Sequence, residues 1–396
     1  MKKSVAIIGG GPAAFAAAAF LDPALFNVTI YEKNKSLGRK FLVAGKGGFN
    51  LTHSEEIEAF KSRYSPTGFL DAALTHFTNH DFRNWLAEIG TPTFVGSSKR
   101  VYPEKGIKPI AVLNRIIECL VAKGVQFEYE HEWINWDENN NLVFTNDVSI
   151  SPDIILFALG GGSWKVTGSD GSWLDIFSKK GIQTVPFRAE NCGFQVDWKP
   201  DFLIQNVGVP IKNCTFSCGG KHQTGEVVIT EFGLEGNAIY ALSSEIQSEL
   251  TSKGRATIYI DFKPGFSESE LQIKLENSDA NTTQALKRTL KLSPTQIALL
   301  KSNLTKEEFT RTAELAKRIK NFPIHLTAAA HIDEAISTSG GIALDEVDEN
   351  FELKSLPSSF CIGEMLDWNA PTGGYLLQGC FSMGARVARH LNDREI

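Results

Sequence analysis

The sequence predicts an α/β protein with a Rossmann-like, dinucleotide-binding fold that is interrupted by an insert of antiparallel strands and helices. Three observations support this fold class. An apolar run at residues 5–8 leads into the glycine turn 9–11, a second apolar run at 28–31 ends in Glu32, and a late apolar run at 360–363 precedes a helix that begins with glycines at 373–374. Strand, glycine turn, helix, strand and acid follow one another in this order in dinucleotide-binding folds.

The glycine turn is expected to approach the diphosphate of a dinucleotide. Gly9 permits the tight turn, and Gly11 lets the backbone come close to the phosphates. The helix that starts here presents its N-terminus to the negative charge, and the small Ala14 keeps it close to the sheet. Glu32 is expected to accept hydrogen bonds from the adenosine ribose. The cofactor contacts predicted in this part of the chain are Gly9, Gly11, Pro12, Ala13, Ala14, Glu32 and Lys33.

The segment 37–53 is rich in glycine and lysine and has too little hydrophobic periodicity for a continuous helix. It has no evident task beside NAD in an open crevice, whereas it can wrap the diphosphate and ribityl chain of the longer FAD. The segment therefore favours FAD, and the alternative is a mobile surface loop. The contacts predicted here are Arg39, Lys40, Gly47, Asn50 and Leu51.

Two later apolar runs end in glycines and are also expected at the cofactor. Residues 153–159 are typical of a buried parallel strand, and 360–363 of a final core strand. A carboxylate after the second strand can bind ribityl hydroxyls, and the free N–H groups of the next helix can stabilise negative charge on a reduced flavin. The alternative is that these glycines only end strands. The predicted contacts are Ala158, Leu159, Gly160, Gly363, Glu364, Asp367, Gly374, Tyr375 and Leu376.

The hydrophobic pattern changes twice along the chain and predicts three parts. These are a cofactor-binding domain at 1–190 and 341–396, a small antiparallel β insert at 191–265 plus 322–340, and a helical subdomain at 266–321. Within the first part, Thr52 and Glu55 form a capping-box pattern before a helix at 56–63. Pro109 opens a helix that continues to residue 120, and a turn at 139–141 joins strands at 133–136 and 142–145.

Composition excludes several function classes. The net charge of −6 argues against a general attraction to nucleic acid or anionic membranes. The six cysteines form no Cys-x-x-Cys pair, so a dithiol-dependent reductase is not expected. Cys214, Cys218 and His222 lack a fourth ligand, and no metal site is expected. No signal peptide or membrane-spanning run is evident, so the cytoplasm is the expected compartment.

Five blocks in this chain together resemble the YhiN/HI0933-type (BaiN/RdsA-like) family of bacterial flavoproteins. The blocks are residues 9–14, 38–53, 100–103 (Arg-Val-Tyr-Pro), 340–342 and 363–367, and they follow the order of the family. One departure is notable: the common pattern has Arg-Cys-Asn where this chain has Gly48-Phe49-Asn50, as in a less characterised subgroup. The resemblance implies an FAD-dependent oxidoreductase with an inserted domain, in which Trp133 borders the adenine.

The family resemblance favours a reductase that passes hydride from flavin N5 to an activated carbon–carbon double bond of a small molecule. A second nucleotide-binding glycine motif is absent, so NADH or NADPH is expected to bind only transiently as electron donor. His53, Lys165 and Tyr375 are the candidate proton donors.

Three alternatives stay open: an oxidase or hydroxylase that uses O2, an RNA-modifying enzyme that reduces uracil, and a non-catalytic flavin redox module. An RNA-binding insert would present clustered basic residues, and the candidates are Lys287, Arg288, Lys291, Lys317, Arg318 and Lys320.

Overall fold

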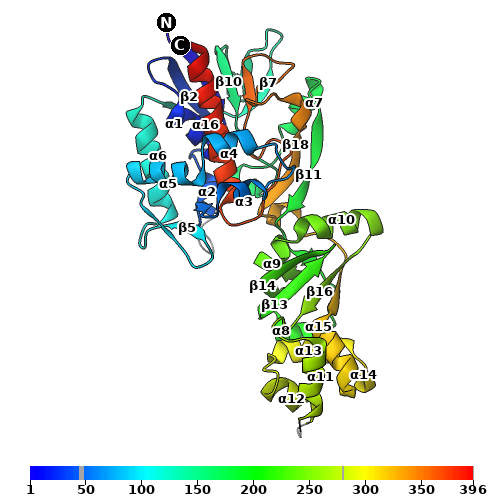
Figure 1. The fold of residues 1–396 in the computed structure, drawn as a ribbon. Helices are drawn as coiled ribbons and strands as arrows, with labels where there is room; N and C mark the ends of the chain where they lie inside the picture. Colours follow the sequence, from blue (N-terminus) through cyan, green and yellow to red (C-terminus); the bar gives the residue numbers. More distant parts are fainter. Residues whose placement is uncertain (44–48, 279–280, 396) are drawn as a thin grey trace. The chain divides into compact units, whose positions relative to one another are not determined.

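The computed structural model describes residues 1–43, 49–278 and 281–395. The chain forms two compact units, which are each described separately. Unit 1 comprises Met1–Arg188 and Ile336–Ile396, and unit 2 comprises Ala189–Ala335 (Figure 1). In the structure the boundaries between the two units lie at 188/189 and 335/336. The sequence analysis predicted them at 190/191 and 340/341.

Unit 1 is built on a parallel sheet of five strands in the order β19-β10-β1-β2-β6. The strands are β1 (Lys3–Ile8), β2 (Phe26–Glu32), β6 (Gln126–Tyr129), β10 (Ile154–Phe157) and β19 (Ser359–Cys361). β1 pairs in parallel with β2 on one side and with β10 on the other. The carboxyl ends of these strands therefore share one edge of the sheet, where open α/β folds bind ligands. This topology is the Rossmann-like sheet that the sequence predicts.

Helix α1 (Pro12–Phe20) and helix α16 (Tyr375–Glu395) pack directly against each other, although they come from opposite ends of the chain (Figure 1). Both lie within the hydrophobic core of unit 1. Residues 13–19 of α1 are all buried, which explains its run of alanines. Among the described helices, none is at once long and hydrophobic enough for a membrane span.

The remaining elements of unit 1 surround this core. The helices are α2 (Arg39–Val43), α3 (Ile57–Lys61), α4 (Asp71–His76), α5 (Asn79–Glu88), α6 (Pro109–Ala122) and α7 (Leu174–Lys179), with 3-10 turns at Lys165–Thr167 and Leu344–Glu346. Three small sheets complete it: β3-β5-β4 (Thr52–His53, Arg100–Pro103, Thr93–Val95), β7-β8-β9 (Trp133–Trp136, Leu142–Phe144, Ser149–Ile150) and β11-β18 (Thr184–Glu190, Ser337–Ile342). The predicted β7-β8 hairpin and the helix opened by Pro109 are confirmed.

The capping box predicted from Thr52 and Glu55 is wrong. Thr52 lies in strand β3 opposite Val101, and its hydroxyl donates to Gln378 Oε1 (2.8 Å). Helix α3 begins later, after Glu56, and no side chain caps it. The pattern misled because the partner strand β5 lies far along the chain, and long-range pairing overrides a local propensity.

Unit 2 combines a six-stranded antiparallel sheet with helices around one hydrophobic core. The strands, in spatial order, are β12 (Phe194–Gln195), β15 (Gly233–Glu235), β14 (Lys221–Ile229), β13 (Pro210–Cys218), β16 (Ala256–Asp261) and β17 (Phe322–Leu326). The segment after β17 returns to β12, since Gln195 N–H donates to Ala328 O (2.8 Å) and Thr327 N–H donates to Gln195 O (3.1 Å). This closure makes the sheet barrel-like, as predicted.

The helices of unit 2 are α8 (Pro200–Asn206), α9 (Asn237–Tyr240), α10 (Ser243–Lys253), α11 (Glu268–Glu276), α12 (Thr282–Arg288), α13 (Pro294–Asn303), α14 (Lys306–Thr310) and α15 (Thr312–Lys320), with a 3-10 turn at Ile332–Glu334. Side chains of α11, α12, α13 and α15 belong to the same buried cluster as the strands. The predicted β and helical parts of the insert therefore share one core.

Candidate cofactor site and active site

A cavity opens at the carboxyl ends of the parallel strands of unit 1. It brings together segments that the sequence analysis singled out one by one. Fourteen of the predicted cofactor contacts line it: Gly9, Gly11, Pro12, Ala13, Glu32, Lys33, Arg39, Lys40, Trp133, Ala158, Leu159, Gly160, Gly363 and Glu364. They come from the β1–α1 turn, the end of β2, helix α2 and the ends of β10 and β19. The ends of four strands and the starts of two helices thus converge on one space.

The glycines of the β1–α1 turn have different tasks. Gly9 has φ +103°, and a Cβ built on it would lie 2.5 Å from Ala158 O, so the tight packing of β1 on β10 needs glycine. Gly11 has an ordinary φ of −105°, and a Cβ there would meet no atom within 4 Å. The N–H groups of Gly11, Ala13 and Ala14 donate to no acceptor among the described residues. Gly11 therefore leaves space open beside free donors.

The carboxylate of Glu32 is buried at the end of β2 and is held by the protein itself. Oε2 accepts from Gly10 N–H (2.9 Å), and Oε1 accepts from the backbone and side-chain amides of Asn34 (2.9 and 2.6 Å). A carboxylate has about four acceptor positions, so one position on Oε2 remains for a ligand. The turn and the acid are thus fixed relative to each other before any ligand binds.

One wall of the cavity was not predicted. Thr167, Gly168, Ser169, Ser172, Trp173 and Ile176 line it. Lys33 Nζ reaches Asp170 Oδ2 in this segment (2.9 Å), and Arg39 Nη2 donates to Val166 O (2.9 Å). These contacts tie the segment to β2 and α2. Its two glycines, Gly168 and Gly171, both have positive φ, and the sequence analysis did not single them out.

Lys40 and Glu364 were both predicted to contact the cofactor, and the structure joins them to each other. Lys40 Nζ lies 3.2 Å from Glu364 Oε2 and 2.9 Å from Ser163 Oγ. Asp367 lies outside the cavity lining, and its Oδ1 accepts from Gly340 N–H (2.6 Å). After β19, Glu364 therefore contacts helix α2, and Asp367 contacts strand β18.

The other predicted residues do not line the cavity. Ala14, Asn50 and Leu51 are separate from its lining, as are Gly374 and the first two residues of α16, Tyr375 and Leu376. Lys165 is exposed and also outside the lining. Gly47 lies outside the described residues.

The start of α16 packs against strand β3. A Cβ on Gly374 (φ +100°) would lie 2.5 Å from Thr52 Cα, so only glycine permits this approach. The N–H groups of Gly374, Tyr375 and Leu376 donate to no acceptor among the described residues. Because the first N–H groups of a helix have no partner within it, they can receive a ligand oxygen.

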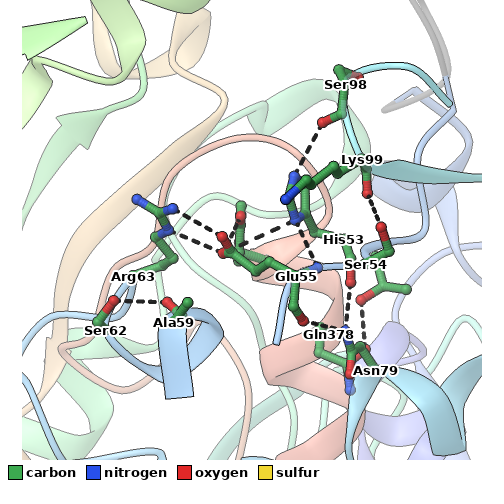
Figure 2. A network of polar contacts seen from close by, with 12 residues as sticks. His53, Ser54, Glu55, Ala59, Ser62, Arg63, Asn79, Ser98, Lys99 and Gln378 are labelled. Carbon is green, nitrogen blue, oxygen red and sulfur yellow. Dashed lines mark hydrogen bonds and ion pairs between the residues drawn. The ribbon is translucent and has the colours of Figure 1, made fainter. Parts of the chain in front are cut away.

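A polar network fixes this helix start (Figure 2). Glu55 lies between Arg63 and His53 in Figure 2, and Arg63 holds its carboxylate through Nε (3.0 Å) and Nη2 (2.9 Å). The hydroxyl of Tyr375 donates to Glu55 Oε1 (2.5 Å). Burial alone would raise the pKa of Glu55, but the hydrogen bonds from Arg63 and Tyr375 outweigh it and lower that pKa. Burial, and then Glu55, raise the pKa of Tyr375 well above the usual value.

His53 has both ring nitrogens engaged with backbone groups (Figure 2). Nδ1 accepts from Glu55 N–H (3.3 Å), which leaves Nε2 as the protonated nitrogen, 3.2 Å from Ser98 O. Burial lowers the pKa of His53, and Glu55 offsets only part of this. The ring stacks on Tyr375 (5.2 Å between centroids). Both ring nitrogens of His53 thus have backbone partners, which fix the orientation of the ring.

We expect Tyr375→Phe to lower the free energy of unfolding by about 1.5–3 kcal/mol at neutral pH, because it removes a hydrogen bond to an ionised carboxylate. The lowered pKa of Glu55 means that this stabilisation is present above the unfolded-state pKa and is lost as pH falls through the folded-state pKa. Urea unfolding of both proteins at pH 7 and at about pH 3 measures the difference. Equal stabilities at pH 7 would contradict the assigned contact.

A model of the HI0933-like protein Rossmann domain matches residues 3–390. The chain belongs to the HI0933-like family. It is 26% identical to the ribosomal RNA dihydrouridine synthase of Haemophilus influenzae over 95% of both chains. It is 23% identical to the 3-dehydro-bile acid delta(4,6)-reductase of Clostridium scindens over 98% of this chain and 99% of that one.

Two solved structures share the fold of this HI0933-like protein. A flavocytochrome c3 fumarate reductase in an open conformation matches with a TM-score of 0.50 and 14% identity, over 98% of this chain and 78% of that one. A 3-ketosteroid-delta4-(5alpha)-dehydrogenase from Rhodococcus jostii RHA1 matches with a TM-score of 0.50 and 14% identity, over 98% and 96%. The predicted family and Rossmann-like fold are confirmed.

The cavity of this HI0933-like protein suits the adenosine diphosphate part of FAD. Gly11 leaves space where a side chain would block a diphosphate, and the free N–H groups beside it can receive phosphate oxygens. Glu32 keeps one acceptor position for a ribose hydroxyl. The indole N–H groups of Trp133 and Trp173, which also line the cavity, are buried without an acceptor in the described part of the chain. The free N–H groups beside Gly11 suit an anionic phosphate, and the Glu32 carboxylate suits a neutral hydroxyl group.

Proposed function

We propose that this protein is an FAD-dependent reductase of small molecules with a carbon–carbon double bond conjugated to a carbonyl group. The observation that carries the proposal is the pairing of the cavity at the β1–α1 turn with a second set of free donors at the start of α16. The likeness to a 3-dehydro-bile acid delta(4,6)-reductase supports the reaction class. The substrate and the electron donor are part of the proposal, with NADH or NADPH as the first donors to test.

We assign the two ends of the cofactor to different residues. Gly11 and Glu32 hold the diphosphate and the adenosine ribose, and the Lys40–Glu364 ion pair lines the same cavity. The N–H groups of Gly374, Tyr375 and Leu376 receive the oxygen of the flavin pyrimidine edge, where the helix start favours negative charge. FAD, when bound, supplies hydride to the β-carbon of the substrate.

Arg100 is the side chain that we assign to the carbonyl group of the substrate. It is half-buried at the start of β5, and its Nε lies 3.4 Å from the place of a Cβ on Gly373, directly before α16. Its guanidinium has no hydrogen bond or ion pair to any described residue, whereas Arg63 and Lys40 are both paired. When the β-carbon receives hydride, negative charge develops on the carbonyl oxygen, and a fixed cation there stabilises it.

We assign positioning roles to two of the three predicted proton donors, and the third lies outside the cavity. His53 and Tyr375 position the start of α16 through Glu55, since their nitrogens and hydroxyl already have partners. A raised pKa also makes Tyr375 a weaker acid. Lys165 is exposed outside the cavity. We propose that the α-carbon takes its proton from water, which completes the conversion of the double bond to a single bond.

We expect Arg100→Gln to lower kcat/KM for an enone substrate by about a hundredfold, because the developing oxyanion loses its cation. The affinity for FAD should stay nearly unchanged, since Arg100 does not line the cavity of the adenosine end. Arg115→Gln, in helix α6, is the matched control and should keep full activity. Equal loss in both variants would contradict the assignment.

The decisive experiment begins with the purified protein, which we expect to be yellow and to take up one FAD. Anaerobic reduction with NADH and with NADPH identifies the donor, and reoxidation by enones, quinones, uracil-containing RNA or oxygen identifies the acceptor. Reoxidation by enones with recovery of the saturated product supports the proposal. A protein that binds no FAD, or whose flavin only oxygen reoxidises, contradicts it.

Reduction of uracil in ribosomal RNA is the second candidate, because two curated relatives, at 26% and 24% identity, carry the name ribosomal RNA dihydrouridine synthase. The basic residues of the insert support it only partly. Arg318 pairs with Glu314 (3.2 Å), and Lys320 pairs with Asp261 (2.5 Å). Charges neutralised in this way contribute little to phosphate binding. Salt-dependent binding of ribosomal RNA fragments, with formation of dihydrouridine, would favour this candidate over the first.

A further inference from the structure

The small sheet β3-β5-β4 carries a pair of aromatic side chains that stays partly open to solvent. Phe94 on β4 and Tyr102 on β5 are register partners, and their rings stack with 5.7 Å between centroids and 28° between planes. Phe94 is 39% exposed, and Tyr102 is half-buried. Small-molecule sites are lined mainly by apolar and aromatic side chains with a few polar groups among them. The pair is therefore a candidate for contact with a ligand.

The aromatic pair lies on the face of the sheet that the start of α16 approaches. Side chains two positions apart on a strand share a face, so Arg100 and Tyr102 of β5 lie on the same side. His53 on β3 is the register partner of Arg100 and belongs to this face as well. The ring of Tyr375, the first residue of α16, stacks on His53 with 5.2 Å between centroids. The face thus carries the aromatic pair at one side and the helix start at the other.

Arg100 lies between the aromatic pair and the helix start, and we have assigned it to the carbonyl group of the substrate. Its Nε lies 3.4 Å from the place of a Cβ on Gly373, directly before α16. Tyr102 follows two positions later on β5, which is about 7 Å at the rise of a strand. One small molecule can therefore place a carbonyl oxygen at the cation and an attached ring on the aromatic pair.

We propose that Phe94 and Tyr102 determine substrate specificity by contacting a flat ring on the carbonyl carbon of the substrate, so that the protein prefers aryl enones to aliphatic ones. The inference rests on the proposed function for the enone and adds the group that the enone carries. An aryl ring gains from stacked or edge-on contact with other aromatic rings, beyond the area that it buries. A short aliphatic group bound at Arg100 lacks this contact, because it does not extend as far as Tyr102.

The test compares phenyl propenyl ketone with methyl propenyl ketone, which share the reacting double bond and differ only in the group on the carbonyl carbon. The unmodified protein should have the higher kcat/KM for the phenyl ketone, mainly through a lower KM. Phe94→Leu and Tyr102→Leu keep an apolar side chain, and each should lower this preference by about threefold to tenfold. Because the preference is a ratio measured on one preparation, a variant that is partly unfolded still reports it.

Val95→Ala is the matched control. Val95 is adjacent to Phe94 on β4 and is 44% exposed, but its side chain points to the opposite face of the sheet. This variant should keep the preference of the unmodified protein. An unchanged preference in Phe94→Leu and Tyr102→Leu, or an equal loss in Val95→Ala, would overturn the inference.

A binding measurement separates this inference from the proposed function. Naphthoate and decahydronaphthoate are carboxylates of similar size, and only the first is flat. In calorimetric titrations the unmodified protein should bind naphthoate more tightly, and Phe94→Leu should reduce that difference. This result would support the aromatic contact even if no enone reoxidised the reduced flavin. Conversely, turnover of both ketones with equal kcat/KM would refute the inference and leave the proposed function intact.

Discussion

Gly11→Val should give a folded protein that no longer binds FAD. The backbone at Gly11 is extended, with φ −105° and ψ −177°, and a branched side chain accepts this conformation without strain. A Cβ there meets no protein atom within 4 Å, so the fold has room for it. The added atoms would instead fill the space assigned to the diphosphate. We expect affinity for FAD to fall at least about a hundredfold, or ~2.7 kcal/mol.

Gly9→Ala is the informative contrast from the same turn. A Cβ on Gly9 would lie 2.5 Å from Ala158 O, and its φ of +103° is strained for any other residue. We expect this variant to lose about 2–4 kcal/mol of stability. Thermal unfolding without flavin and FAD titration together separate the two effects. A Gly11→Val protein that stays yellow would contradict the placement of the diphosphate, and one that unfolds would contradict the open space at Gly11.

Gly384→Val should be the most destabilising change in helix α16. A Cβ on Gly384 would lie 2.5 Å from Ala13 O and 2.7 Å from Ala17 N, both backbone atoms of α1. Backbone cannot move aside as a flexible side chain can, so the two helices must separate. We expect a loss of about 3 kcal/mol or more in the free energy of unfolding, measured by urea titration.

Asp393→Ala provides the control on the same helix, because the Asp393 side chain is 67% exposed. Its stability should stay within about 0.5 kcal/mol of the unmodified protein. If Gly384→Val were equally harmless, the close crossing of α1 and α16 would be wrong. Because α1 follows the diphosphate turn and α16 begins at the assigned flavin head, loosening this crossing should also release FAD.

The sequence predicted the cavity best where the signal is local. The turn at Gly9 and Gly11 and the acid at Glu32 lie within one strand–helix–strand unit, and their spacing alone defines the arrangement. The start of α16 at Gly374 was likewise marked by glycines that the close approach to β3 requires. At the first site the neighbouring residues explain the conformation, whereas at Gly374 the glycines mark the position and the strand that they approach lies far away in the sequence.

The sequence predicted least where the partners lie far apart. The hydrogen bond from the Tyr375 hydroxyl to Glu55, 320 residues away, was not predicted, because no pattern near either residue indicates it. Thr52 looked like a helix cap because the strand that pairs with it lies elsewhere in the chain. The wall at Trp173 has no motif, since it faces the cavity only once β10 and the segment after it are folded.

The way in which Glu32 is held affects how the protein exchanges its cofactor. Two neighbouring amides of Asn34 and the N–H of Gly10 already orient the carboxylate. When the ribose leaves, the carboxylate of Glu32 therefore keeps its three hydrogen bonds to the protein. When a ribose binds, the carboxylate is already oriented, so binding costs little conformational entropy at this side chain. Flavin removal should consequently be reversible, with a stripped protein that regains its colour on simple mixing.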